Sequence, residues 1–569
     1  MPLRMLFLTN KIRNCSGYKL FLLKISFSYR AISLLLLLFI CKTSIAQQKI
    51  AAPQNADTVR IIQILQGKSL RQKTIDSGFV IETIAGNAIL KEGTTLFYCD
   101  SVVINHHTNI MEAFGNVHIN QNDSINTYSQ HLRYFAGDRV AWLDKDVKLT
   151  DKKGTLYTQA LKYDLKSNIG EYSNGGKVVN GKTVLTSDNG TYYADTKDVD
   201  FKNNVHMVDP KYDIVTDSMM YNTQTQVTTF ITETFIKSIK TGGDIYTKSG
   251  TYDLTNGKGF FGSRTIFRDS THTTYTADNS AIDENSGNAQ LEGNAVIKDS
   301  VDGYTILGNQ VFLNKKNNTF LATRKPVLIF NGNGHDSTII AADTLFSGVE
   351  KKDTLQFPTS QTDSLKVDTL KETTVISSSD TAIRYFKAFH HVRIFNDSLQ
   401  SVCDSLFYSS EDSIFRLFQQ PLVFANNSQI SGDTIYLYTK NHQPSRLYVF
   451  ETGMIINQAN KIMYNQIRGR TINGYFKNGV LDYMRTRGSP AESVYYPQNE
   501  DSSYIGMNRS KGDVIDIYFI NKEVNKVKLI NDVDGTLYPL GQVPPDQKFL
   551  KNFTWWDARR PKSKLELFE

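Results

Sequence analysis

The sequence predicts an all-β protein whose tandem repeats of about 30 residues form a twisted, β-solenoid-like stack. Tyr134, Tyr163, Tyr192 and Tyr221 are each 29 residues apart, and Tyr252 follows 31 residues later. Segments of alternating apolar and polar residues, typical of half-buried strands, are separated by Asn-Gly, Asp-Gly and Gly-Gly turns. Such units bury a core only by stacking, so we expect function on a long surface or groove rather than in one cleft.

A second marker recurs in step with the tyrosines, as Gly115-Asn-Val117, Lys145-Asp-Val147 and their equivalents. The marker valine begins an alternation that predicts an inward apolar row. The row consists of Val117, Ile119, Val147, Leu149, Val205, Met207, Ala295, Ile297, Val327 and Ile329. The sequence leaves open whether this row fills a closed core or lines an open groove, because inward residues look alike in both.

The first 46 residues have the composition of a secretory signal peptide. They contain seven Lys or Arg, no Asp or Glu, an apolar run at 32–40, and Ser44-Ile-Ala46 before Gln47. The apolar run is shorter than the roughly 20 residues of a spanning helix. We therefore expect export and a mature N-terminus near Gln47; acylation of Cys41, as in a lipoprotein, is the alternative.

The charge balance excludes one class of partner. The chain has 64 basic and 57 acidic residues, and removing the seven basic residues of the signal peptide leaves 57 of each sign. A neutral chain has no electrostatic footprint for nucleic acid. The mature chain keeps Cys99 and Cys403, both in Cys-Asp-Ser, which we interpret as buried free thiols rather than a disulfide.

Composition divides the chain into six segments. They are the signal peptide (1–46), a polar lead-in (47–78), a first repeat region (79–348), a Ser/Thr/Asp-rich loop or linker (349–384), a second, more divergent repeat region (385–542), and a Pro-rich basic tail (543–569).

No residue pattern indicates catalysis, a metal site or a cofactor. An Asp recurs before the Tyr segments, at Asp100, Asp188, Asp217, Asp278, Asp343, Asp404 and Asp433. Stacked carboxylates could serve acid/base or calcium chemistry, but an aspartate that belongs to the repeat template favours a turn or a rung-to-rung ladder. The histidines lack metal-ligand spacing, and the recurring tyrosines favour a structural ladder over a binding platform.

The tail combines aromatic and basic residues outside any repeat. Trp555, Trp556, Arg559 and Arg560 are flanked by several lysines. Side chains of these types dominate protein interfaces. They predict docking on a partner or on lipid headgroups, with capping of the last strand as the alternative.

The repeat unit resembles a known family. The order Gly115-Asn-Val-His-Ile119, then Tyr134, then Val140-Ala-Trp-Leu143, after a signal peptide, is similar to the organic-solvent-tolerance (OstA)-like, LptA-type periplasmic domain of lipopolysaccharide transport. The resemblance covers about 79–348 well and 391–475 more loosely. It implies an open, twisted β-jellyroll around an apolar groove for acyl chains, and head-to-tail stacking of such domains.

These observations predict a non-enzymatic, lipid-binding protein. The resemblance implies a periplasmic location, either free or associated with the outer membrane, and lipopolysaccharide or lipid A as ligand. Implied partners are other envelope transport proteins, with possible head-to-tail self-association. The alternative is a structural or adhesive β-solenoid that binds protein or polysaccharide on its outer face. An enzyme of the β-helix type ranks third.

Overall fold

The computed structural model describes residues 61–75, 78–301, 303–330, 337–350, 383–440 and 443–568. The chain divides into two compact units, Met1–Ile61 and Ile62–Glu569, and every element below belongs to the second. The predicted signal peptide, Cys41, and residues 351–382 of the predicted linker lie outside the described residues. No helix in the described ranges is long and apolar enough to cross a membrane.

Antiparallel strands make up nearly all of this unit, as the sequence predicts. Up to residue 222 they are β1 (Gln63–Gln66), β2 (Ser69–Thr74), β3 (Val80–Glu92), β4 (Thr95–Asn105), β5 (Ile110–Gln121), β6 (Ile125–Phe135), β7 (Val140–Thr150), β8 (Thr155–Asp164), β9 (Ile169–Tyr172), β10 (Gly176–Asn180), β11 (Thr183–Ser187), β12 (Asn189–Tyr193), β13 (Asp198–Val208) and β14 (Tyr212–Asn222). They continue with β15 (Val227–Phe230), β16 (Thr234–Ser238), β17 (Asp244–Thr247), β18 (Gly250–Asp253), β19 (Lys258–Phe261), β20 (Thr265–Arg268), β21 (Thr274–Ala277), β22 (Asn279–Asp283), β23 (Asn288–Asp299), β24 (Tyr304–Asn314), β25 (Thr319–Thr323), β26 (Val327–Phe330), β27 (Thr338–Ala341) and β28 (Thr344–Glu350).

The second repeat region has the same strand pattern. Its strands are β29 (Ile383–Asn396), β30 (Leu399–Ser409), β31 (Ile414–Phe418), β32 (Leu422–Ala425), β33 (Ser428–Ser431), β34 (Thr434–Lys440), β35 (Gln443–Phe450), β36 (Gly453–Gln458), β37 (Tyr464–Gly469), β38 (Thr471–Lys477), β39 (Val480–Tyr495), β40 (Met507–Ile520), β41 (Glu523–Ile530) and β42 (Asp534–Tyr538). Short 3-10 helices follow in the tail, η1 (Leu540–Gln542), η2 (Pro545–Gln547), η3 (Asp557–Arg559) and η4 (Leu565–Leu567).

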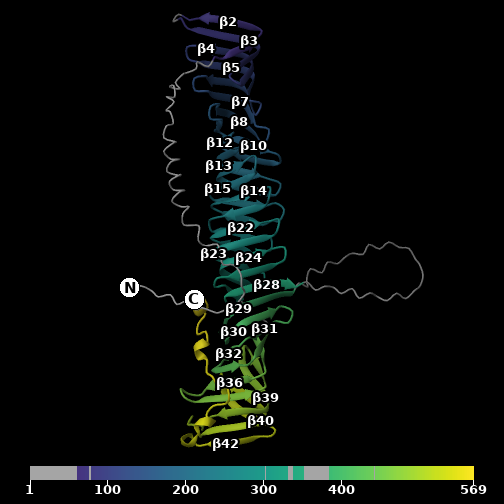
Figure 1. Cartoon of the computed structure of the whole chain (residues 1–569), viewed down its shortest axis with the longest axis vertical. Helices are drawn as coiled ribbons and strands as arrows, with labels where there is room; N and C mark the ends of the chain where they lie inside the picture. The colour runs from purple at the N-terminus through teal and green to yellow at the C-terminus, as the bar shows by residue number, and fades with distance from the viewer. Residues whose placement is uncertain are drawn as a thin grey trace, which may run out of the picture. The chain divides into compact units, whose positions relative to one another are not determined.

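The strands form two walls that share their long strands and run from β2 to β42 in chain order (Figure 1). After β8, one wall continues through β9, β12, β15 and β18, while the other continues through β10, β11, β16 and β17. Long strands such as β13 and β14 belong to both walls, because each bends from one wall into the other. We call the wall with β9 and β12 wall one, and the wall with β10 and β11 wall two.

The bend explains the Gly-Asn marker. Gly115 and Asn116 both have positive φ, 71° and 45°, and the strand register shifts between Phe114 and Val117 at this point. Gly86-Asn87, Lys145-Asp146, Asn203-Asn204 and Gly293-Asn294 repeat the geometry. Two left-handed residues in a β-bulge turn the strand sharply, and Gly and Asn adopt that conformation most readily. The marker therefore specifies the corner where the two walls join.

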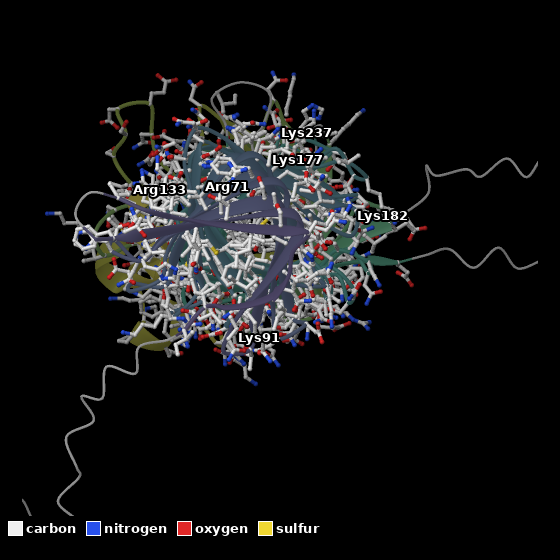
Figure 2. All side chains as sticks on the ribbon, turned by 90° about the horizontal axis from the view of Figure 1, so that it is seen from above. Arg71, Lys91, Arg133, Lys177, Lys182 and Lys237 are labelled. Atoms are coloured by element: carbon white, nitrogen blue, oxygen red, sulfur yellow. The ribbon has the colours of Figure 1, made fainter. Side chains whose placement is uncertain are left out.

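Apolar side chains fill the space between the walls. One buried cluster extends from Ile84 to Phe267 and a second from Ala277 to Phe519, and Tyr275 packs against both. Most charged side chains lie on the outside, although Glu92, Asp151 and Asp516 are buried. Viewed along the stack, Lys91, Lys182 and Lys237 project from the rim (Figure 2).

The first part of the tail shares a buried cluster with Tyr538 of the last strand. From η1 onward the tail runs back along the outer face of wall two, and its Leu567 is buried against Val327, Ile339 and Phe395 (Figure 1). Two glutamines of wall two hold its backbone through their side-chain amides: Gln466 bonds to Lys548 and Leu550, and Gln429 bonds to Thr554 and Trp556. A third, Gln400, accepts a hydrogen bond from the guanidinium of Arg560.

Candidate functional site

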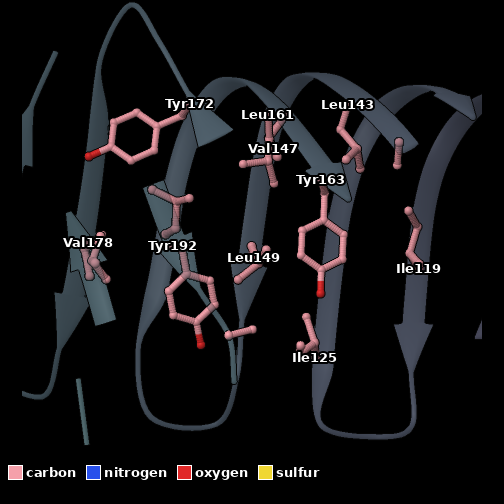
Figure 3. Close-up of a cluster of buried hydrophobic side chains, with 14 of the residues drawn as sticks. Ile119, Ile125, Leu143, Val147, Leu149, Leu161, Tyr163, Tyr172, Val178 and Tyr192 are labelled. Carbon is pink, nitrogen blue, oxygen red and sulfur yellow. The ribbon is translucent and has the colours of Figure 1, made fainter. Parts of the chain in front are cut away.

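Eight of the ten residues predicted for the inward row lie between the walls. Val117, Ile119, Val147, Leu149, Val205, Met207, Ala295 and Ile297 are each at most 2% exposed and belong to the two interior clusters. Figure 3 shows Ile119, Val147 and Leu149 directed toward the space between the strands. The alternation that begins at the corner places them there.

Val327 and Ile329 lie on the outer face of their wall, so the inward position predicted for them is wrong by one residue. They pack on the outer side, in the cluster that buries Leu567 of the tail. The corner here is Arg324-Lys325, both with φ of 61°, so Pro326 rather than Val327 occupies the first inward position. A one-residue shift moves every following side chain to the other face. Leu328 is the residue that enters the interior cluster.

The interior is closely packed in this structure. A cavity of about 20 Å³ lies among Leu149, Leu156, Val178 and Tyr192, and one of about 40 Å³ lies among Phe330, Ile394, Leu399 and Tyr408. Spaces of this size hold one to a few waters. An acyl chain can therefore enter at these two places only if the walls move apart.

In the described residues, the chain passes from one wall to the other at the corners, which lie along one side of the stack. On the opposite side the strand-connecting turns of the two walls face one another, and polar side chains bridge them. The residues that end wall-two strands, or follow them directly, recur at intervals of 29, 30 and 29: Glu92, Gln121, Asp151 and Asn180. All four are at most 8% exposed. We call this row, with the tyrosines it contacts, the polar seam.

Each repeat of the polar seam pairs one of these groups with a tyrosine of wall one. Tyr134 donates to Glu92 at 2.6 Å and Tyr163 to Gln121 at 2.9 Å, while Tyr192 donates to Asp151. Asn180 in turn donates to Tyr221 at 3.1 Å. Figure 3 shows the hydroxyls of Tyr163 and Tyr192 pointing the same way. The periodic tyrosines are thus a structural ladder, at most 5% exposed from Tyr134 to Tyr252.

Turn residues of wall one complete the polar seam. Gln121 donates to Asn168 at 2.8 Å, Asn180 to the Thr223 carbonyl at 2.7 Å, and Lys197 lies 3.2 Å from Asp151. Arg139 lies 3.6 Å from Glu92. This row is not among the predicted site residues, although a polar residue at one repeat position, in step with the tyrosines, signals it in the sequence.

The pKa values of the polar seam follow from burial and hydrogen bonding. Burial opposes ionisation of Asp151, but the hydrogen bonds from Tyr192, from the Gly154 and Lys153 N–H groups, and from Lys197 outweigh it, so the pKa of Asp151 is lowered. Burial, with the neighbouring Asp151, raises the pKa of Tyr192. Burial also raises the pKa of Tyr221 to about 12. At neutral pH the seam therefore consists of neutral tyrosines and an ionised Asp151.

Hydrogen bonds at the corners account for most of the recurring aspartates. Asp100, Asp188 and Asp278 each accept from the corner asparagine 16 residues later, at 3.0, 2.7 and 2.8 Å. Asp343 contacts His391 at 2.8 Å, and Asp433 accepts from Thr452 at 2.6 Å. These contacts connect neighbouring repeats, as expected for the rung-to-rung ladder predicted for these aspartates. In the described part of the chain, no three His, Cys, Asp or Glu side chains are grouped so that they could hold a metal ion.

The two histidines at the equivalent repeat position lie on an outer face. His118 stacks between Tyr98 and Tyr128, with ring centroids at 5.1 and 4.4 Å, and His206 contacts Asp213 at 2.8 Å. The thiols of Cys99 and Cys403 are free and buried, as predicted.

Of the four docking residues predicted in the tail, two hold the tail in place. The Trp555 ring lies 5.6 Å from that of Tyr464, and Arg560 bonds to Gln400 at 2.9 Å. Trp556 and Arg559 remain exposed and contact each other, with the guanidinium 5.7 Å from the ring. Partner docking through the tail stays a prediction.

The fold and the interior define a repeat protein in which two antiparallel walls enclose a continuous apolar row. Residues 61–217 match the model of a family described as OstA-like protein, which confirms the predicted resemblance for this segment. Twenty-one chains of solved structures match, among them LptH of Pseudomonas aeruginosa, described as the LptA homologous periplasmic component of the conserved lipopolysaccharide transport device. That match has 13% identity, covers 18% of this chain and 79% of LptH, and has a TM-score of 0.18. No curated protein matches.

Proposed function

We propose that this protein is a non-catalytic carrier of lipopolysaccharide or lipid A in the periplasm, and that it holds acyl chains between its two walls. The observation that supports this most directly is the polar seam. In an OstA-like segment, a continuous apolar interior is covalently closed along the corners and joined by polar contacts along the opposite side.

The free energy needed to open the polar seam is comparable to the free energy gained when an acyl chain fills the interior. One intramolecular hydrogen bond contributes about 0.5–1.5 kcal/mol net. Burying one CH₂ group contributes about 0.8 kcal/mol. Two methylenes therefore offset one opened hydrogen bond, and the apolar contacts between the walls are exchanged for contacts with the chain. Each repeat adds two strands and roughly 9–10 Å of interior length.

We expect opening to begin at the Glu92 repeat. The Glu92 side chain is fully buried, and its Oε1 has no hydrogen-bond partner in the described structure. The Nε atom of Arg139 is likewise buried without a hydrogen bond there. Buried polar groups left unpaired cost free energy, so this repeat resists separation least.

The ends of the stack support the proposal of head-to-tail association with another copy or an envelope transport protein. Within the described residues, β1 and β2 pair only with β3, and β41 and β42 pair only with β40. Each end therefore presents two free strand edges, which are templates for pairing with another chain. Leu70 and Leu537, on these strands, are more than half exposed.

Photo-crosslinking in cells tests the proposal. A photoreactive residue at Ile119, between the walls, should capture lipopolysaccharide, whereas one at Tyr128, on the outer face of the paired strand, should not. Capture from Tyr128 without capture from Ile119 would contradict it and favour the adhesive scaffold.

A disulfide across the polar seam tests the opening itself. The pair Gln121→Cys and Asn168→Cys replaces two side chains that touch. Oxidation should abolish capture at Ile119 and reduction should restore it, while the matched serine pair should be insensitive to redox state. Unchanged capture in the oxidised protein would show that lipid does not pass the seam.

A further inference from the structure

A larger cavity lies outside the walls, between the tail and the corners of wall two. Its volume is about 580 Å³. The corner side contributes Thr452, Arg468 and Arg470, and the tail contributes Lys551, Trp556 and Arg559. The volume is in the range of small-molecule sites, about 300–1,000 Å³.

The cavity has an excess of positive charge. Arg468 is paired with Glu492 at 2.8 Å and Arg470 with Glu451 at 3.0 Å. Lys551 and Arg559 both line the cavity. Neither has a carboxylate within ion-pair distance in the described part of the chain. Asp433, beside the lining Gly432, accepts from Thr452 at 2.6 Å and adds one carboxylate near the cavity. Two uncompensated cations next to hydroxyl and amide groups form a binding site for an anion.

Attachment of the tail does not require these cations. The tail is held by the backbone contacts of Gln429 and Gln466 and by the burial of Leu550 and Leu567. Lys551 follows Leu550, and Arg559 lies between the anchored Trp556 and Arg560. The anchors place both cations at the cavity, and their side chains remain free to bind a ligand.

Trp556 adds a flat apolar surface to the same cavity. The residue is 44% exposed, and its ring lies 5.7 Å from the Arg559 guanidinium. An exposed indole packs against the C–H face of a sugar ring, while the adjacent guanidinium and ammonium groups pair with phosphate oxygens.

We propose that this cavity binds a phosphorylated sugar, with Lys551 and Arg559 on the phosphoryl group and Trp556 against the ring. The site is separate from the interior and does not depend on lipid transport. The sugar phosphate can be a soluble metabolite or the headgroup of a glycolipid, since both present the same chemistry.

Calorimetry on the full chain tests the proposal with glucose 1-phosphate, glucose, and phosphatidylcholine vesicles with and without lipid A. Binding of glucose 1-phosphate, or of the lipid A vesicles alone, supports the site, and the active ligand identifies its source. Glucose and plain vesicles should not bind. The double variant K551Q/R559Q should weaken binding at least tenfold, W556A should weaken it severalfold, and K562Q, a tail lysine paired with Asp557 outside the cavity, should leave it unchanged.

Binding that survives in K551Q/R559Q, or no binding of either phosphorylated ligand, would overturn the proposal. Unchanged hydrogen exchange of the tail backbone in each variant verifies that the cavity is still assembled. Because Ile119 crosslinking reports on the interior and this titration on the tail, failure of one proposal can be distinguished from failure of the other.

Discussion

Replacing Tyr192 by Phe removes one hydroxyl from the polar seam and leaves the ring in place. The side chain of Asp151 is 2% exposed, and its other contacts are Lys197 at 3.2 Å and the N–H groups of Lys153 and Gly154 at 3.0 and 2.8 Å. A hydrogen bond to a charged group contributes about 1.5–3 kcal/mol. At about 1.4 kcal/mol per tenfold, local opening should become about 10- to 100-fold more frequent.

Hydrogen-exchange mass spectrometry of peptides spanning 151–156 and 189–199 measures this change, because a long repeat array need not unfold in two states. Tyr193→Phe is the control, since Tyr193 is 36% exposed on the outer face. The pKa of Asp151 is lowered in the folded state, so its contribution is present above the unfolded value of about 3.9 and is lost as pH falls through the folded value. The difference between the variants should therefore shrink in strong acid. Equal exchange in both variants at neutral pH would show that the Tyr192–Asp151 hydrogen bond does not hold the two walls together.

Three further predictions concern the corners, the tail and the thiols. Asn116→Val should cost about 1–2 kcal/mol more than Asn116→Gly in thermal melting, because a φ of 45° is strained for a β-branched residue, while both variants lose the hydrogen bond to Asp100. Leu567→Ala should cost about 2–5 kcal/mol of local stability and speed tryptic cleavage at Lys562 and Lys564. Leu565→Ala, at a position 74% exposed, is the control and should change neither. Equal cleavage of the two variants would contradict the docked tail. Burial raises the pKa of the Cys99 and Cys403 thiols to about 12, so iodoacetamide at pH 8 should label them only after unfolding, and rapid labelling of the native protein would contradict their burial.

The sequence determined the repeat, its length and, for every strand of the predicted inward row except that of Val327 and Ile329, the face that is buried. Period-two alternation and a spacing of 29 residues are local properties of the chain, so Val117, Ile119 and Tyr163 could be placed inside without a structure. The buried free thiols followed from the same repeat logic.

The predicted register was wrong at the corner before Val327. Arg324-Lys325 adopts the left-handed pair that Gly or Asn supplies elsewhere, and the following proline resembled the middle of a marker. The sequence shows which residues tolerate positive φ most easily, but packing of the wall decides which residues adopt it.

The tertiary structure alone decided how the two walls and the tail meet. The polar seam joins residues about 42 positions apart, such as Tyr134 and Glu92. The tail meets wall two across longer separations, 82 positions between Gln466 and Lys548 and 125 between Gln429 and Thr554. Alternation specifies a face but not the distance between two faces, so it could not say whether the interior is packed or open. That distance depends on how buried polar groups of opposite walls satisfy one another, which is a property of the assembled stack rather than of any repeat.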